Sequence, residues 1–324
     1  MAKRDRAAEL LDALSAATSA GPSVALPLVK KGLAHAAGPV VERAAKAAAN
    51  LNLDAIGPLL GDALGRLLDG DYRNADAAVT VLDAMRQLRA DDRDGYRRAL
   101  RCTWEAPGYG GSDEVGAHVR AAACRALVES GDAGAPLLLA GLLFERTREN
   151  AAARIAAAQG LGICGDAEAV EVLRIKLTRA VADEPDVLGE CCGAIARIDA
   201  PDADVFLRAY LGTASIAVLE GAAVPIGEAR RPSSWPLLRA IRERLLRADR
   251  EAAAMYGLAV VREAAATGLL IERLRDGPPN VAQAAAEALG LLAGDVEVAR
   301  RAGDACAARP DGRSLLALMR AAAP

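Results

Sequence analysis

The chain has 324 residues, a formal net charge of −3 and six cysteines. Charge this close to balance gives no strong field for nucleic acid or anionic lipid, and the length suits either two average domains or one elongated repeat array. Alanine occupies 77 positions, whereas phenylalanine and tryptophan occur twice each. Because alanine is the best helix former and strands favour β-branched and aromatic residues, this composition predicts an all-α protein.

Residues 1–72 are predicted to form an N-terminal helical cap of three or four short helices. Gly-Pro steps at Gly21, Gly38 and Gly57 separate its helical stretches. The basic residues near the start precede no apolar run, and no run of eighteen apolar residues occurs along the sequence. We therefore expect neither a secretory leader nor a membrane span, and a cytoplasmic location as the default.

Residues 73–324 are predicted to form a right-handed α-solenoid of about six to seven helix pairs. A degenerate first copy starts at Ala75, and the Gly-rich stretch PGYGGSDE follows it from Pro107. This stretch matches neither the P-loop nor the dinucleotide fingerprint, and no strand is predicted before it. With Trp104 and Tyr109 beside it, it is either an adhesive surface loop or a plain connection whose Trp104 packs on the helices.

Three copies of a two-helix pattern then align without gaps. They begin at Arg120, Ala153 and Leu188, and their turn positions Asp132, Asp166 and Ala200 are 34 residues apart. Gly131 and Gly165 precede two of these turns. Glycine can adopt left-handed backbone angles and aspartate can cap free amides, so each Gly-Asp step predicts a helix end followed by a new helix start.

Three further copies follow with looser spacing and turn positions at Glu228, Glu263 and Asp295. A small residue precedes each turn by six positions, or by seven in the last copy: Ala126, Gly160, Ala194, Ala222, Gly257 and Ala288. Leucines four apart follow the turn in four copies: Leu139 and Leu143, Leu173 and Leu177, Leu207 and Leu211, Leu270 and Leu274. The pattern predicts first helices that approach one another closely and second helices with an apolar stripe.

The stretches at Arg120, Ala153 and Ala282 resemble HEAT-like repeats of the kind first defined in phycobilin lyases, and the GLGICGD at residues 160–166 resembles them most. The resemblance covers roughly residues 75–310 and implies an α-solenoid. It leaves activity open, because the matching residues are packing and turn residues and the family includes scaffolds, lyase subunits and enzymes.

No catalytic, cofactor-binding or metal-binding residues are predicted. His35 and His118 lie far apart and have no acidic residue or cysteine at ligand spacing, and the chain lacks the His-Glu pairs of the HEAT-like deoxyhypusine hydroxylases. The cysteines form no CxxC pair and lie mostly within apolar helical pattern. We interpret them as small, reduced core residues.

An arginine-rich segment between Glu228 and Arg250 contains seven arginines and three acidic residues. It provides five candidate partner-binding residues: Arg230, Arg231, Arg239, Arg242 and Arg244. An acidic segment or helix of another protein could dock there through charge-assisted, bidentate hydrogen bonds. The alternative is an ordinary solvated helix face, whose charges contribute little.

A non-catalytic protein-interaction scaffold or adaptor is the function that this pattern favours. Solenoids present a long concave face, here expected to consist of second helices and to include Glu171, Arg174, Arg208, Arg239 and Arg242. One alternative is a cofactor-attachment subunit like the bilin lyases. Another is a nucleic-acid-binding protein like the HEAT-like alkylpurine DNA glycosylases, which the charge balance and the scarcity of aromatic residues disfavour.

Overall fold

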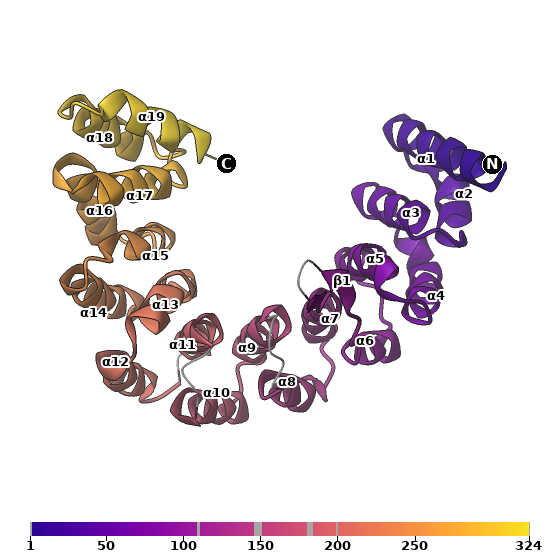
Figure 1. The fold of residues 1–324 in the computed structure, drawn as a ribbon, viewed down its shortest axis with the longest axis horizontal. Coiled ribbons are helices and arrows are strands. Elements are labelled where there is room, and N and C mark those ends of the chain that lie inside the picture. The colour runs from indigo at the N-terminus through magenta and orange to yellow at the C-terminus, as the bar shows by residue number, and fades with distance from the viewer. Residues whose placement is uncertain (1, 109–110, 146–150, 180–183, 199, 324) are drawn as a thin grey trace. The chain divides into compact units, whose positions relative to one another are not determined.

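The computed structural model describes residues 2–108, 111–145, 151–179, 184–198 and 200–323 (Figure 1). Nearly all elements in these ranges are helices, which confirms the all-α prediction. The chain divides into two compact units, Met1–Gly160 and Leu161–Pro324. Within the described ranges, every helix is too short or too polar to span a bilayer.

The first unit alternates between two layers of helices. Its elements are α1 (Ala2–Ala20), α2 (Pro22–Leu33), α3 (Gly38–Asn50), η1 (Asp54–Ile56), α4 (Gly57–Leu68), η2 (Tyr72–Asn74), α5 (Ala75–Gln87), α6 (Arg93–Ala99), β1 (Ala106–Gly108), β2 (Gly111–Asp113), α7 (Gly116–Glu129), α8 (Ala135–Leu143) and most of α9 (Ala152–Cys164). Helices α1, α3, α5 and α7 contact one another in sequence, and so do α2, α4 and α6. The odd-numbered helices therefore form one layer and the even-numbered helices the other.

The predicted helix breaks in the N-terminal segment are confirmed. Helix α2 starts at Pro22, and α3 and α4 start at Gly38 and Gly57 with proline in their first turn. Proline suits this position because the first amides of a helix have no intrahelical acceptor. Helices α3 and α4 both pack on α5, so the boundary expected at residue 72 falls inside the first unit.

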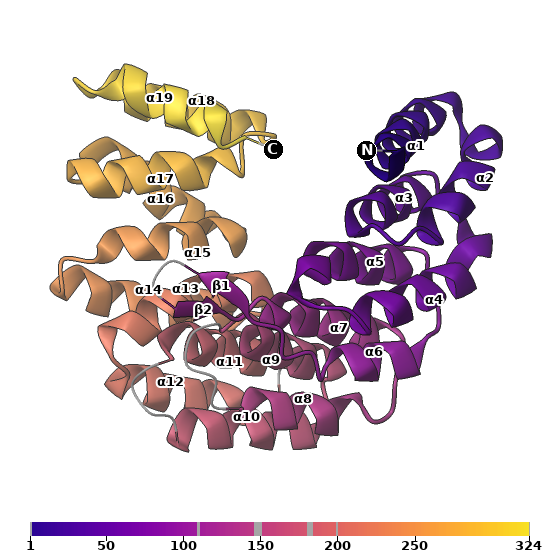
Figure 2. The ribbon, with the colours of Figure 1, turned by 45° about the vertical axis from the view of Figure 1, so that its right-hand side comes forward.

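The second unit continues the alternation of first and second helices. Its elements are α10 (Ala167–Arg179), α11 (Pro185–Ile198), α12 (Ala203–Thr213), α13 (Ile216–Ala229), α14 (Ser234–Arg247), η3 (Glu251–Ala254), α15 (Met255–Val260), α16 (Ala264–Asp276), α17 (Pro279–Gly290), α18 (Val296–Ala307) and α19 (Gly312–Ala321). Helices α11, α13, α15, α17 and α19 contact one another in order. Figure 2 shows α15, α17 and α19 one above another.

First helices end in a recurring turn with one left-handed residue. These residues are Asn52 (φ 50°), Arg89 (φ 51°), Gly131 (φ 67°), Gly165 (φ 72°), Arg230 (φ 49°) and Arg262 (φ 58°). The positive φ at Gly131 and Gly165 confirms the predicted helix ends. Aspartates then cap the next helix: Oδ1 of Asp166 accepts from the Ala169 amide at 2.6 Å, and Oδ1 of Asp295 accepts from the Val298 amide at 3.1 Å.

The turn predicted at Glu228 is wrong. Helix α13 runs through Glu228 to Ala229, and the left-handed residue is Arg230. The Gly227–Glu228 step looks like the Gly-Asp steps of earlier copies, but Gly227 has a different role. A Cβ at Gly227 would lie 2.4 Å from the Gly257 carbonyl oxygen, so this glycine permits close packing of α13 on α15.

Small residues bring the first helices of the second unit very close together, as the repeat pattern predicts. A Cβ at Gly189 would lie 2.3 Å from the carbonyl carbon of Gly221, and one at Gly193 would lie 2.2 Å from Pro225 Cβ. All eight leucines of the predicted second-helix stripes are buried. Backbone-to-backbone packing in one layer and leucine packing in the other give the two layers different spacings.

The second unit curves toward its first helices. In Figure 1, α11, α13, α15 and α17 lie on the inner side of this unit, and α12, α14, α16 and α18 lie on the outer side. Closer approach between the first helices explains the direction of the curve. The second helices, which were expected to line a concave face, are therefore the outer layer of this unit.

Candidate functional site

Arginines link neighbouring helix pairs through backbone carbonyls. Nη2 of Arg231 donates to the carbonyl of Arg197 at 2.8 Å, and Nη1 of Arg244 donates to the carbonyl of Leu211 at 2.5 Å. The partners are 34 and 33 residues apart, which is the repeat length. Because helix C-termini carry carbonyls without intrahelical donors, these two candidate residues have a structural role.

Arg242 belongs to a buried charge cluster. Its Nη2 lies 2.5 Å from Oε1 of Glu251, and Nε of Arg273 lies 3.4 Å from the same oxygen. The side chains of Glu251 and Arg242 are 3% and 11% exposed. A partner cannot use Arg242 without breaking this cluster, so Arg242 holds α14 against η3.

Arg230 and Arg239 are exposed but engaged within the unit. Nε of Arg230 donates to the carbonyl of Val260 at 3.0 Å. Nε of Arg239 donates to Oε1 of Glu243, one turn along α14, at 3.2 Å. An exposed pair of this kind contributes little to stability, so Arg239 remains available to a ligand.

Glu171 and Arg174 lie together on α10 beside α12. Nη1 of Arg174 donates to Glu171 at 3.1 Å and Nη2 to Asp202 at 2.9 Å, and the hydrogen bond that Asp202 accepts raises the pKa of Arg174. The Arg174 guanidinium stacks 5.1 Å from the centre of the Phe206 ring. This arrangement neutralises Arg174 and fixes its side chain.

We define Arg208, Arg244 and Arg247 together as the basic patch. Arg244 and Arg247 line an open pocket with Ile216 and Ala248. Arg208 is exposed on α12, one helical turn before the Leu211 carbonyl that Arg244 contacts.

The charges of the basic patch are not neutralised by a carboxylate of the described residues. Among the described residues, Arg244 and Arg247 donate only to backbone carbonyls, and Nε of Arg247 reaches the Glu243 carbonyl at 3.1 Å. Arg208 makes no hydrogen bond or ion pair within the described ranges. Each guanidinium keeps free N–H donors, since it has five in all. Arg208 and Arg244 were predicted from the sequence, but Arg247 was not. Its place in a candidate site depends on the pocket that it lines, which the sequence does not show.

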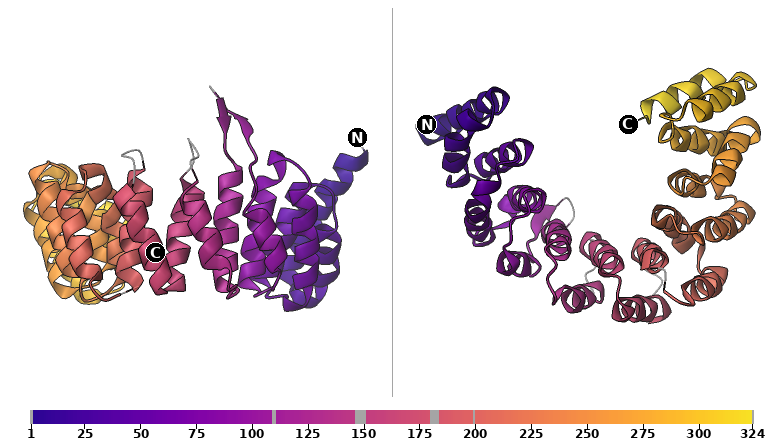
Figure 3. Two further views of the ribbon diagram at one scale, coloured as in Figure 1. Left: turned by 90° about the horizontal axis from the view of Figure 1, so that it is seen from below. Right: turned by 180° about the vertical axis from the view of Figure 1, so that it is seen from behind.

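The Gly-rich stretch contributes to two short strands that the sequence did not predict. Strands β1 and β2 pair antiparallel with Pro107 opposite Ser112, and the hairpin extends past the ends of the neighbouring helices (Figure 3). Three-residue strands of glycine, proline and small polar residues lack the β-branched signal, which explains the miss.

The base of the hairpin is fastened to α7. The carbonyl of Trp104 accepts from the Gly116 amide at 2.9 Å, and Nη1 of Arg120 donates to the carbonyl of Cys102 at 2.6 Å. The Trp104 side chain is half-buried. Tyr109, the second aromatic candidate, lies outside the described residues.

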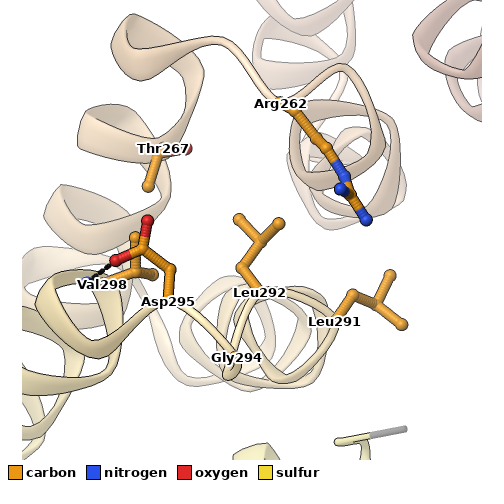
Figure 4. Close-up of a pocket in the computed structure, with 7 residues that line it drawn as sticks. All are labelled: Arg262, Thr267, Leu291, Leu292, Gly294, Asp295 and Val298. Carbon is orange, nitrogen blue, oxygen red and sulfur yellow. Dashed lines mark hydrogen bonds between the residues drawn. The ribbon is translucent and has the colours of Figure 1, made fainter.

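A small pocket opens beside the turn between α15 and α16 (Figure 4). Its volume is about 270 Å³, and its lining consists of Arg262, Thr267, Leu291, Leu292, Gly294, Asp295 and Val298. Cofactor sites usually exceed this volume, so the pocket suits a single side chain. The turn predicted at Glu263 lies in this region, but no sequence signal pointed to the preceding Arg262.

The cysteines lie where the sequence predicts, in the interior: all are buried except Cys164, which is half-buried. Burial raises the pKa of Cys124 to about 12. Nδ1 of His35 accepts from the Ala37 amide at 3.0 Å. Among the residues that the structure describes, no three His, Cys, Asp or Glu side chains are grouped as metal ligands.

No family model and no curated protein matches the chain. A solved structure of an engineered protein is similar over 98% of this chain and 93% of that one, with 16% sequence identity and a TM-score of 0.36.

Proposed function

We propose that the chain is a right-handed HEAT-like α-solenoid of about six to seven helix pairs, capped by residues 1–72, that acts as a non-catalytic scaffold or adaptor in the cytoplasm. Its partner is another protein, which it binds through an acidic segment or helix. The observation that carries this proposal is the basic patch of Arg208, Arg244 and Arg247, whose charges no carboxylate of the described residues neutralises.

The patch suits a carboxylate-bearing segment that also carries apolar side chains. Ile216 lies in the same pocket as Arg244 and Arg247, and the exposed Leu246 precedes Arg247 on α14. Guanidinium and carboxylate groups form charge-assisted, bidentate pairs, and apolar contacts alongside them exclude water. Because exposed ion pairs contribute only about 0.2–1 kcal/mol each, we expect modest affinity that weakens with added salt.

Partner capture with a charge-reversed patch tests the proposal. The double variant Arg208→Glu and Arg247→Glu leaves the Arg244 link to Leu211 in place. Arg301→Glu with Arg313→Glu is the matched control, because both arginines are exposed in the same unit and make no ion pair within the described ranges. Tagged proteins are purified from nuclease-treated host extract, and bound proteins are identified by mass spectrometry.

We expect a stoichiometric partner with an acidic segment that binds the original protein and the control but not the patch variant. Recovery of no stoichiometric protein would contradict the scaffold proposal. A partner that the patch variant retains would leave the scaffold in place and remove the basic patch as its contact. An alanine variant of Arg242 would be a poor test, because its loss breaks the buried cluster with Glu251.

A further inference from the structure

Arg262 occupies a position at which the backbone favours glycine. Its φ is 58°, and the residues at the same turn position of two earlier pairs are Gly131 and Gly165, with φ of 67° and 72°. A side chain in the left-handed region is strained, and glycine relieves this strain. Arg89 and Arg230 occupy the same turn position in other pairs, so the surroundings of the Arg262 side chain decide whether it has a role.

The side chain of Arg262 has no role within the described part of the unit. It is exposed, and it makes no hydrogen bond or ion pair with any described residue. It lies at the rim of the small pocket in Figure 4, which we call the turn pocket, with the half-buried side chains of Leu291, Leu292 and Val298 in its lining. A guanidinium beside aliphatic side chains matches a ligand with a carboxylate beside an aliphatic group.

Asp295 adds a hydrogen-bond acceptor to the same pocket. Its Oδ1 accepts from the amides of Glu297 and Val298 at 2.9 and 3.1 Å, which holds the carboxylate at the start of α18. Oδ2 accepts no hydrogen bond from the described residues. The turn pocket thus offers a fixed acceptor, a cation and an apolar surface.

We infer that the turn pocket binds the C-terminal residue of a partner chain, with an aliphatic side chain at that residue. The terminal carboxylate pairs with Arg262, the side chain packs on Leu291 and Leu292, and the residue's N–H donates to Oδ2 of Asp295. One residue carries all three groups on one α-carbon, and the pocket volume of about 270 Å³ holds one residue and not a helix. The inference rests on the proposed function, since the ligand is a protein.

Fluorescence polarisation tests the inference with a defined probe. The probe is a fluorescein-labelled heptapeptide that ends in leucine with a free carboxylate, and the comparison peptide has the same sequence with an amidated end. We expect the free acid to bind at least tenfold more tightly than the amide. Arg262→Gly should abolish binding of the free acid, and its Tm should stay the same or rise by about 2 °C.

Arg89→Gly is the matched control, because Arg89 has the same side chain and a φ of 51° at the equivalent turn of the first unit. It should bind the probe like the original protein. Equal binding of the free acid and the amide would overturn the inference, as would unchanged binding by Arg262→Gly. A fall in Tm for Arg262→Gly alone would also overturn it, because Arg262 would then be a structural residue.

The two proposals fail separately. Capture of a partner through the basic patch, without binding of the peptide, would refute the turn pocket alone. Peptide binding without a captured partner would refute the scaffold function and leave the turn pocket as a carboxylate site.

Discussion

Removing the carboxylate of Glu251 should destabilise the second unit more than removing any exposed charge. Glu251 is 3% exposed, and its Oε1 lies 2.5 Å from Nη2 of Arg242 and 3.4 Å from Nε of Arg273. Glu251→Ala leaves the largely buried Arg242 guanidinium without its carboxylate. Breaking a buried pair costs about 3–5 kcal/mol, and the partial exposure of both arginines places our estimate at about 3 kcal/mol of unfolding free energy.

The positions of the two tryptophans allow the loss of unfolding free energy to be measured in the second unit. Trp104 belongs to the first unit, and Trp235 lies in α14 of the second. In a Trp104→Phe background, Trp235 fluorescence during urea unfolding reports on the second unit alone. Glu251→Ala should lower the urea midpoint without changing the slope of the transition.

Two variants separate loss of the buried pair from loss of a charge. Glu243 is 47% exposed and pairs with Arg239, so Glu243→Ala should cost less than about 0.5 kcal/mol. Replacing Arg242 and Glu251 together, with Arg242→Met and Glu251→Leu, should recover most of the lost stability, because Arg273 keeps its ion pair with Glu272 at 2.9 Å. A loss below about 1 kcal/mol for Glu251→Ala would refute the reasoning.

Three further predictions concern packing, links and pH. Gly193→Ala should lower the unfolding free energy by at least about 2 kcal/mol, because the new Cβ would lie 2.2 Å from the Cβ of Pro225. Gly268→Ala should raise it by about 0.5 kcal/mol, because nothing lies within 4 Å of the new Cβ. Urea unfolding of the two variants measures both changes. Arg231→Ala should lower the unfolding free energy by about 1–2 kcal/mol, because it removes the 2.8 Å hydrogen bond to the Arg197 carbonyl. A loss no larger than that of Arg301→Ala would contradict the linking role of Arg231. Burial raises the pKa of Cys124 from 9.0 to about 12, so its stabilising contribution is complete below pH 9 and is lost as pH rises toward 12. Between pH 8 and 10 the original protein should lose more unfolding free energy than Cys124→Ala, on the order of 1 kcal/mol, and equal losses would exclude this thiol.

Local signals in the sequence predicted most of the helices. Gly-Pro steps identified the starts of α2, α3 and α4, and Gly131 and Gly165 identified turns, because these residue types act through their own backbone angles. The turn near Glu228 failed because Gly227 serves the packing of α13 on α15, which depends on a residue 30 positions away.

The candidate site was less predictable, because the availability of an arginine depends on tertiary contacts. Arg231 and Arg242 look alike in sequence, yet one donates to a backbone carbonyl and the other to a buried carboxylate. Arg262 was not predicted as a site residue, because a turn pattern indicates the backbone angles of a position and not the function of its side chain. Only the pocket beside it gives that side chain a possible ligand.

The arginine links recur at nearly constant spacing along the chain. The links of Arg231 and Arg244 span 34 and 33 residues, and Arg66 reaches the Leu33 carbonyl over 33 residues in the first unit. Donor and acceptor therefore recur at the same period as the helices. Copying one whole pair of helices would copy a donor together with an acceptor, whereas an insertion of half a pair would shift every later link out of phase.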